Sequence, residues 1–162
     1  MQAIEEPAIV AYFRHNTWAN LKLLDACEGL SDEQLDLTAP GTFGTIRETL
    51  LHIVLNEQNY LSLLTAQAPE NPLHRGQWPG IADLKERAGT LGAALAAQSA
   101  RVQLTTVLRP TFQGQEVDLP AYIVLLQAIN HGAEHRTHIT TIMSHHGLEA
   151  PALDAWAFND EL

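Results

Sequence analysis

The chain has 162 residues, enough for one domain with its own hydrophobic core, and 46% of them are hydrophobic, as in ordinary globular proteins. Nine basic residues against nineteen acidic ones give a formal net charge of −10, which repels phosphate backbones and anionic lipid surfaces. Arginine and lysine are also scattered singly along the chain, so we expect neither nucleic acid nor a membrane as a partner.

The single cysteine and the beginning of the chain bear on the cellular compartment. Cys27 has no second cysteine with which to form an internal disulfide, which suits a reducing environment. Residues 1–7 lack the basic start and the apolar run of a signal peptide, and no stretch reaches the ~18 apolar residues of a membrane span. We therefore expect a cytoplasmic protein in which Cys27 is a small buried residue of the first helix.

The first long helix is expected between Pro7 and Glu28. Proline suits the first turn of a helix because the amide hydrogen that it lacks has no partner there, and Gly29 suits the end. A capped helical turn follows at residues 31–34, and residues 39–44 have the composition of a loop.

The second long helix is expected to begin at a capping box formed by Thr45 and Glu48, in which each side chain satisfies the backbone amide of the other residue. It continues to about Ala66. The three prolines in residues 67–80 predict a loop. A third helix then runs from about Ile81 to Gln103, with an alanine-rich middle that allows close approach of a neighbouring backbone.

The helical pattern of apolar residues ends in residues 102–119, which contain threonine, valine and glycine instead. They predict two short extended pieces around a turn at Gly114. The fourth long helix is expected to start at residue 118 or 119, with Pro120 in its first turn, and to end near His146.

Four long helices in a chain of this length predict an all-α fold, a four-helix bundle. The connections that precede and follow the third helix are longer than minimal bundle loops, so the topology need not be simple up-and-down. The tail, with Trp156 and Phe158, is expected to pack on the bundle as a strap. Since the sequence contains no repeat, low-complexity segment or linker, we expect one domain over residues 1–162.

Three histidines lie within eight residues of the fourth helix, in the segment His131-Gly-Ala-Glu-His135-Arg-Thr-His138. His131 and His135 are four residues apart, so they stack one turn apart on one helix face. On a helical wheel at ~100° per residue they fall within the apolar face. A buried polar group without a partner costs about 1–3 kcal/mol, so these imidazoles need either core hydrogen bonds or a shared metal ion.

Two histidines do not complete a catalytic site of the zinc type, which uses three protein ligands and an open position. His138 drifts toward the edge of the apolar face, and three ligands on one straight helix converge poorly. His52 on the second helix is the best third candidate, although its polar neighbours Asn56 and Asn59 are equally compatible with a solvated face. His15 on the first helix is a further candidate without support from its neighbours.

Four segments, taken in order, resemble the DinB-like family of four-helix-bundle metalloproteins, which includes thiol-dependent S-transferases. They are residues 12–24 with the motif Trp18-Ala-Asn20, the turn Leu30-Ser-Asp-Glu-Gln-Leu35, the second-helix segment Thr45–Ile53, and Asn130-His131-x-x-x-His135-Arg136. The tail around residues 147–151 is similar to the family pattern as well.

The resemblance implies one divalent metal ion held by His52, His131 and His135, and zinc or nickel suits imidazole ligands. It also implies an open coordination position, a small-molecule substrate and a homodimer. Some family members use a low-molecular-weight thiol, so the first expectation is a thiol-dependent transferase. No catalytic residue is assigned beyond the metal ligands.

Three other uses of the same residues stay open. The order His131-x-x-Glu134-His135 is that of one zinc peptidase class, although those enzymes resemble much larger proteins with an acidic ligand downstream. The same metal could instead serve a hydrolase, or a non-enzymatic, stress-related metal-binding module. A structural site would normally have four protein ligands, so three histidines favour an enzyme. A di-iron carboxylate bundle is disfavoured because the chain has no Glu-x-x-His pair.

Overall fold

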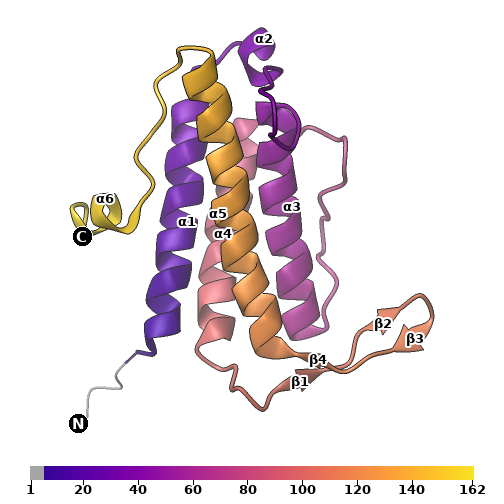
Figure 1. Ribbon diagram of the computed structural model, residues 1–162. Coiled ribbons are helices and arrows are strands. Elements are labelled where there is room, and N and C mark those ends of the chain that lie inside the picture. Colours follow the sequence, from indigo (N-terminus) through magenta and orange to yellow (C-terminus); the bar gives the residue numbers. More distant parts are fainter. Residues whose placement is uncertain (1–5) are drawn as a thin grey trace.

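The computed structural model describes residues 6–162, and its fold is mostly helical. Most of the segment 1–7, considered above as a signal peptide and rejected, lies outside the described residues. The bundle consists of four long helices (Figure 1): α1 (Ala8–Cys27), α3 (Ile46–Thr65), α4 (Ile81–Ser99) and α5 (Ala121–His145). Two short helices accompany them, α2 (Asp32–Leu35) between α1 and α3, and α6 (Ala155–Asn159) in the tail. The predicted all-α bundle is confirmed.

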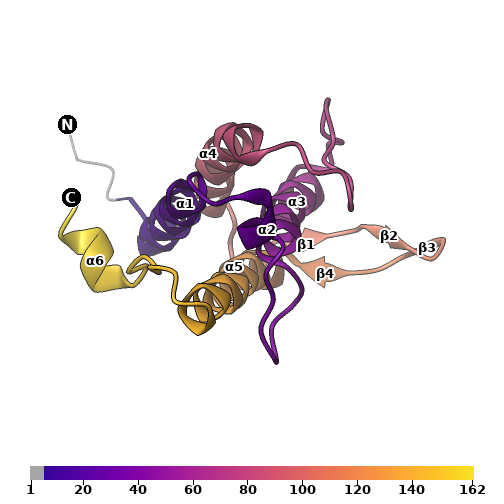
Figure 2. The same ribbon diagram turned by 90° about the horizontal axis from the view of Figure 1, so that it is seen from above.

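The helices are not connected in simple up-and-down order. Seen from above, they are arranged in the order α1, α4, α3 and α5 around the bundle (Figure 2), and each contacts its two neighbours. The long segment 66–80 returns along the bundle from the end of α3 to the opposite end (Figure 1), so α4 runs parallel to α3. The long connection expected from the prolines therefore changes the topology, and α3 and α5 become antiparallel neighbours.

Two clusters of buried apolar side chains fill the bundle, and a layer of polar side chains separates them. The larger cluster lies at the end of the bundle near α2 and includes Leu24, Cys27 and Ile139. The smaller cluster lies toward the other end, around Phe13 and Leu95. Along the helices, six of the buried polar residues come between these clusters; they are Asn16, Asn20, Glu57, His131, His135 and Arg136. Cys27 is fully buried, as predicted.

The second predicted helix is confirmed at both ends. The Thr45 side chain accepts a hydrogen bond from the Glu48 amide at 3.0 Å, and the Glu48 carboxylate accepts one from the Thr45 amide at 3.0 Å. The helix ends at Thr65, where Ala66 adopts the left-handed conformation. This capping box fixes the start of α3, and with it the rotation of the helix that carries His52.

The boundaries expected around residues 100–120 were wrong in two places. The helix α4 ends at Ser99 rather than at Gln103, whose amide instead bonds to the Thr106 hydroxyl at 3.0 Å. The helix α5 begins at Ala121, so residues 118 and 119 are not helical and Pro120 is the N-cap.

The helix α5 begins later than expected because a two-stranded ribbon, which projects from the end of the bundle, precedes it (Figure 1). β1 (Val107–Leu108) pairs antiparallel with β4 (Leu119–Pro120), and β2 (Thr111–Phe112) pairs antiparallel with β3 (Gln115–Glu116). The hairpin predicted at Gly114 is therefore confirmed. Because β4 pairs with β1, its backbone is held extended, and the helix α5 begins only after it.

The tail packs against α1 through one of its two predicted aromatic residues. The Phe158 ring contacts Trp18, with ring centroids 5.3 Å apart, whereas Trp156 is 82% exposed. The His15 imidazole bonds to the Leu153 carbonyl at 2.9 Å, so it anchors the tail. None of the described helices is both long enough and apolar enough to cross a membrane.

Candidate metal centre

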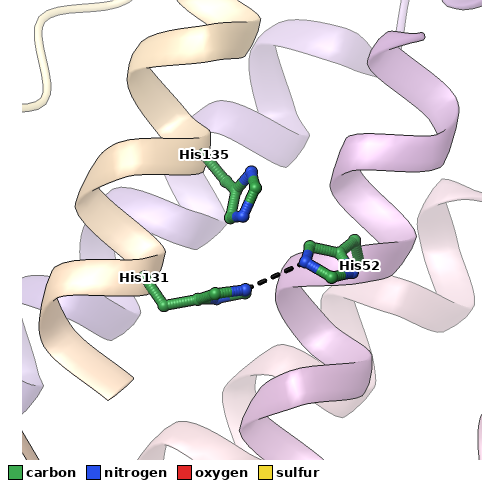
Figure 3. Close-up of side chains that lie close together, drawn as sticks. All are labelled: His52, His131 and His135. Carbon is green, nitrogen blue, oxygen red and sulfur yellow. Dashed lines mark hydrogen bonds between the residues drawn. The ribbon is translucent and has the colours of Figure 1, made fainter. Parts of the chain in front are cut away.

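Three imidazoles converge where α3 faces α5 (Figure 3). His52 comes from α3, and His131 and His135 come from successive turns of α5. The Nε2 atoms of His52 and His131 are 3.0 Å apart. One ring nitrogen of each histidine lies within 4.8 Å of the others. The structure thus brings together the three residues that the sequence indicated.

The surroundings hold these rings in place. His131 and His135 are 9% and 7% exposed, and His52 is half-buried. The Phe43 ring stacks on His52 with centroids 4.2 Å apart and meets His135 edge-on at 4.8 Å. Phe43 was not identified as a site residue from the sequence. Its position, two residues before the cap of the helix that carries His52, is the feature that could have indicated it.

Burial lowers the pKa of all three imidazoles. The pKa of His52 and that of His131 fall to about 4, and the pKa of His135 also lies below its usual range. Neighbouring imidazoles add to the effect, because protonation would bring like charges together. The rings are therefore neutral at pH 7, the state that a metal ligand requires.

The donor set fits one divalent metal ion. A zinc–nitrogen distance of about 2.0–2.1 Å places two nitrogens of a tetrahedral site about 3.4 Å apart. The observed separations of 3.0 Å and up to 4.8 Å bracket this value. Within residues 6–162, the converging group contains three histidines and no fourth protein ligand, which leaves a coordination position for an exogenous group.

The other candidates lie outside this group. The His138 Nδ1 atom is 3.3 Å from the His135 Nδ1 atom, so His138 contacts a candidate ligand without joining the set. Glu134, the base of the peptidase alternative, is exposed on α5 and absent from the converging donors. The Asn56 amide donates to the His52 carbonyl at 2.8 Å and lies 3.1 Å from its Nδ1 atom, so Asn56 faces His52.

A buried polar network links the two helices that carry the histidines. The Glu57 carboxylate on α3 accepts hydrogen bonds from the side-chain amides of Asn16 and Asn20 on α1, both at 2.7 Å. The Arg136 guanidinium on α5 donates to the side-chain oxygens of the same two asparagines, also at 2.7 Å. Two asparagines of α1 thus bridge opposite charges on α3 and α5, and they tie the helices that present His52 and His135.

The pKa values of both charged groups in this network lie outside their usual ranges. Burial raises the pKa of Glu57 to about 7, against the opposing effect of Asn16 and the Arg136 charge. Burial lowers the pKa of Arg136 to about 10. One carboxylate oxygen of Glu57, Oε2, has no hydrogen-bond partner within the part of the chain that the structure describes.

The raised pKa of Glu57 predicts a pH dependence of folding stability. Between pH 4.5, its ordinary pKa, and about 7, the folded protein binds this proton more firmly than the unfolded chain does. The contribution of Glu57 to the free energy of unfolding therefore falls by roughly 2–3 kcal/mol as the pH rises through this window.

The lowered pKa values of the histidines change the free energy of unfolding with pH in the opposite direction. The test therefore compares the wild type with Glu57→Gln, because this variant keeps the histidines. In urea unfolding between pH 4.5 and 7.5, the wild type should lose stability relative to the variant as the pH rises. A difference that stays constant with pH would contradict this assignment.

Gly132 makes room for the network. A Cβ atom at this position would lie 2.6 Å from the Asn16 Oδ1 atom and 2.8 Å from the Arg136 Nη1 atom. Both atoms are held by the hydrogen bonds described above. Only the absence of a side chain at Gly132 lets α5 approach α1 at this level.

Gly132→Ala is expected to destabilise the protein by about 1–3 kcal/mol, because the added methyl group must displace bonded atoms. Gly89→Ala on α4 is the matched control, since a Cβ there meets no atom within 4 Å. The control should be neutral or stabilising by about 0.5–1 kcal/mol through helix propensity. Urea unfolding of both variants checks this, and equal stability of the two would refute the packing role of Gly132.

Comparison with known proteins gives the family. The family model described as the DinB family matches residues 1–161. Among solved structures, the chain is similar to the crystal structure of a DinB-like protein from Bacillus cereus ATCC 10987, with 25% sequence identity and a TM-score of 0.68. That match covers 89% of this chain and 94% of the other. None of the curated proteins matches. Since the match to the family model extends over nearly the whole chain, the protein belongs to the DinB family.

Proposed function

We propose that this protein is a divalent-metal-dependent enzyme, a thiol-dependent transferase that acts on a small molecule. His52, His131 and His135 would hold the metal ion, with zinc or nickel as the metals suited to imidazole. The observation that carries the proposal is the convergence of three imidazoles, with no fourth protein ligand among residues 6–162. A structural metal site would normally close its coordination sphere with protein side chains, whereas a catalytic site keeps a position open.

A metal ion bound there would lower the pKa of a thiol or water at the open position and so supply a nucleophile at neutral pH. The protein's own residues prepare the site for this. Burial keeps the three imidazoles unprotonated, and the network through Glu57 and Arg136 fixes the distance between their helices. The Phe43 ring packs against His52 and His135.

The test uses protein reconstituted with zinc, nickel or cobalt. With cobalt bound, a low-molecular-weight thiol that occupies the open position should shift the visible absorption spectrum. A panel of common thiols combined with small electrophiles should then show turnover that depends on both. If none of the thiols shifts the spectrum, the thiol proposal is wrong. Turnover with water alone would favour the hydrolase alternative, and no turnover with any pair would favour a metal-binding module.

Two further proposals rest on the resemblance and the sequence rather than on the site. We propose a homodimer, in which the rather apolar helices α3 and α4 take part, and a cytoplasmic location. Sedimentation at micromolar protein concentration tests the first, and a monomer under these conditions would contradict it.

A further inference from the structure

A cavity of about 450 Å³ lies beside the metal centre. His52 forms part of its wall, so this histidine borders both the cavity and the converging imidazoles. The apolar part of the wall consists of Phe43, Leu51, Leu55 and Trp78. Ligand sites in proteins commonly enclose about 300–1,000 Å³, so the space is sufficient for a small organic molecule next to the metal.

Four charged residues line this cavity, and two of them, Asp36 and Arg47, are paired with each other. The Arg47 guanidinium bonds to Asp36 at 2.8 Å and to Asp32 at 2.9 Å, and it lies 5.4 Å from the centre of the Trp78 ring. The Glu48 carboxylate accepts from the Thr45 amide in the capping box. The Arg47 charge is therefore neutralised by carboxylates, whereas Glu48 bonds only to an uncharged amide and keeps its charge.

Arg75 is the basic residue of the cavity wall that has no carboxylate partner among the described residues. Six of the nine basic residues form ion pairs with carboxylates, namely Arg14, Lys22, Arg47, Lys85, Arg87 and Arg109. Arg75 forms none with the carboxylates of residues 6–162, and it is exposed at the cavity. Arg75 and His52 line the same cavity.

Among the described residues, a guanidinium without an ion pair thus lines the cavity in a chain whose net charge is −10. A divalent ion at the three histidines would add positive charge on the same side of the cavity. The planar guanidinium presents parallel N–H groups that match the two oxygens of a carboxylate. The cavity therefore combines an anion-binding group, an aromatic wall and a neighbouring metal ligand.

We propose that this cavity binds a reactant that carries a carboxylate and an apolar body, with the carboxylate paired to Arg75 and the apolar body packed against Phe43 and Trp78. This inference rests on the proposed function, because it places the reactant next to the metal centre. It assigns the substrate class as small organic acids and makes Arg75 the residue that selects them.

Phenylacetate and phenylacetamide are matched probes, since they share shape and differ in charge. Calorimetry with zinc-loaded protein should show phenylacetate binding about tenfold more tightly than the amide, as expected for a charge-assisted pair at a partly exposed site. Arg75→Gln should reduce this preference to less than about threefold, and Arg75→Lys should keep part of it. Arg101→Gln is the control, because Arg101 is exposed and also lacks a carboxylate partner among the described residues, but does not line the cavity. It should keep the full preference.

Three results would overturn the inference. They are equal binding of the two probes by the wild type, no binding of either probe at millimolar concentration, and a carboxylate preference that survives in Arg75→Gln. The last would mean that the carboxylate binds the metal or another part of the surface. The same titration on metal-free protein separates this inference from the proposed function. A preference that depends on Arg75 without metal would support the cavity site even if zinc binding or turnover failed.

A second pair of probes shows which reactant carries the carboxylate. Mercaptoacetate and 2-mercaptoethanol are thiols of similar size, and only the first is an acid. If Arg75 strengthens the spectral response of the cobalt protein to mercaptoacetate alone, the acid is the thiol. If the two thiols respond equally while the preference for phenylacetate depends on Arg75, the acid is the second reactant. Either result supports the carboxylate site.

Discussion

Arg136→Met is expected to destabilise the folded protein by about 3–5 kcal/mol, the usual cost of removing one partner from a buried charge pair. Arg136 is 5% exposed and donates to both Asn16 and Asn20. Methionine would leave two buried amide oxygens without donors and the Glu57 carboxylate without its countercharge. Urea unfolding at pH 7 measures the loss, which is a large share of the 5–15 kcal/mol that stabilises a typical domain.

Two comparisons make this result specific to the network. Arg101→Met, at an exposed position, should change stability by less than about 0.5 kcal/mol. Glu57→Gln combined with Arg136→Met should cost less than the sum of the two single changes, because the residues interact through shared asparagines. A loss below about 1 kcal/mol for Arg136→Met alone would show that the bridged pair does not stabilise the bundle.

His52→Ala is expected to weaken zinc binding by at least about 3 kcal/mol, which is roughly a hundredfold in Kd. Four-ligand zinc sites bind the ion with about 10–16 kcal/mol, so the loss of one imidazole removes several kcal/mol of this binding free energy. His52 is half-buried, so its truncation disturbs the core less than truncation of His131 or His135 would. Competition with a chromogenic chelator measures the affinity.

His145→Ala is the matched control, because His145 lies at the exposed end of α5 and takes no part in the converging donors. Its zinc affinity should equal that of the wild type. If His52→Ala binds zinc as tightly as the control, the metal is not held between α3 and α5, and the proposed site is wrong.

Local spacing predicted the parts of the fold and the site that depend on local structure. The capping box of Thr45 and Glu48 marks the start of α3, and both of its hydrogen bonds are present. The spacing of His131 and His135 places them on one face of α5, and both are buried. In each case, the determining contacts lie within one turn of a helix.

The predictions failed where a distant contact decides the structure. Val102 continues the apolar repeat of Leu91 and Leu95 and packs against the core, yet α4 has already ended at Ser99. The start of α5 depends on the pairing of Leu119 with Leu108 in the ribbon. A helix that ends without a glycine or proline signal gives no strong pattern in the local sequence. The same is true of a strand pair that is only two residues long.

The positions of the third histidine and of the residues around the site are determined by packing between helices. Spacing alone left His52 compatible with a solvated face, and the family resemblance selected it. The buried network was not predicted, because Glu57 and Arg136 are charged residues whose partners lie on α1. Phe43 and Arg75 come from loops, whose positions relative to α3 follow from tertiary structure.

X-ray absorption at the zinc edge of the reconstituted protein identifies the atoms that bind the metal ion. We expect one zinc ion per chain, with three imidazole nitrogens at about 2.0–2.1 Å and one further light-atom ligand. That first shell corresponds to His52, His131 and His135 with an open position filled from solution. A shell of carboxylate oxygens, fewer than three imidazoles, or no stoichiometric zinc would contradict it.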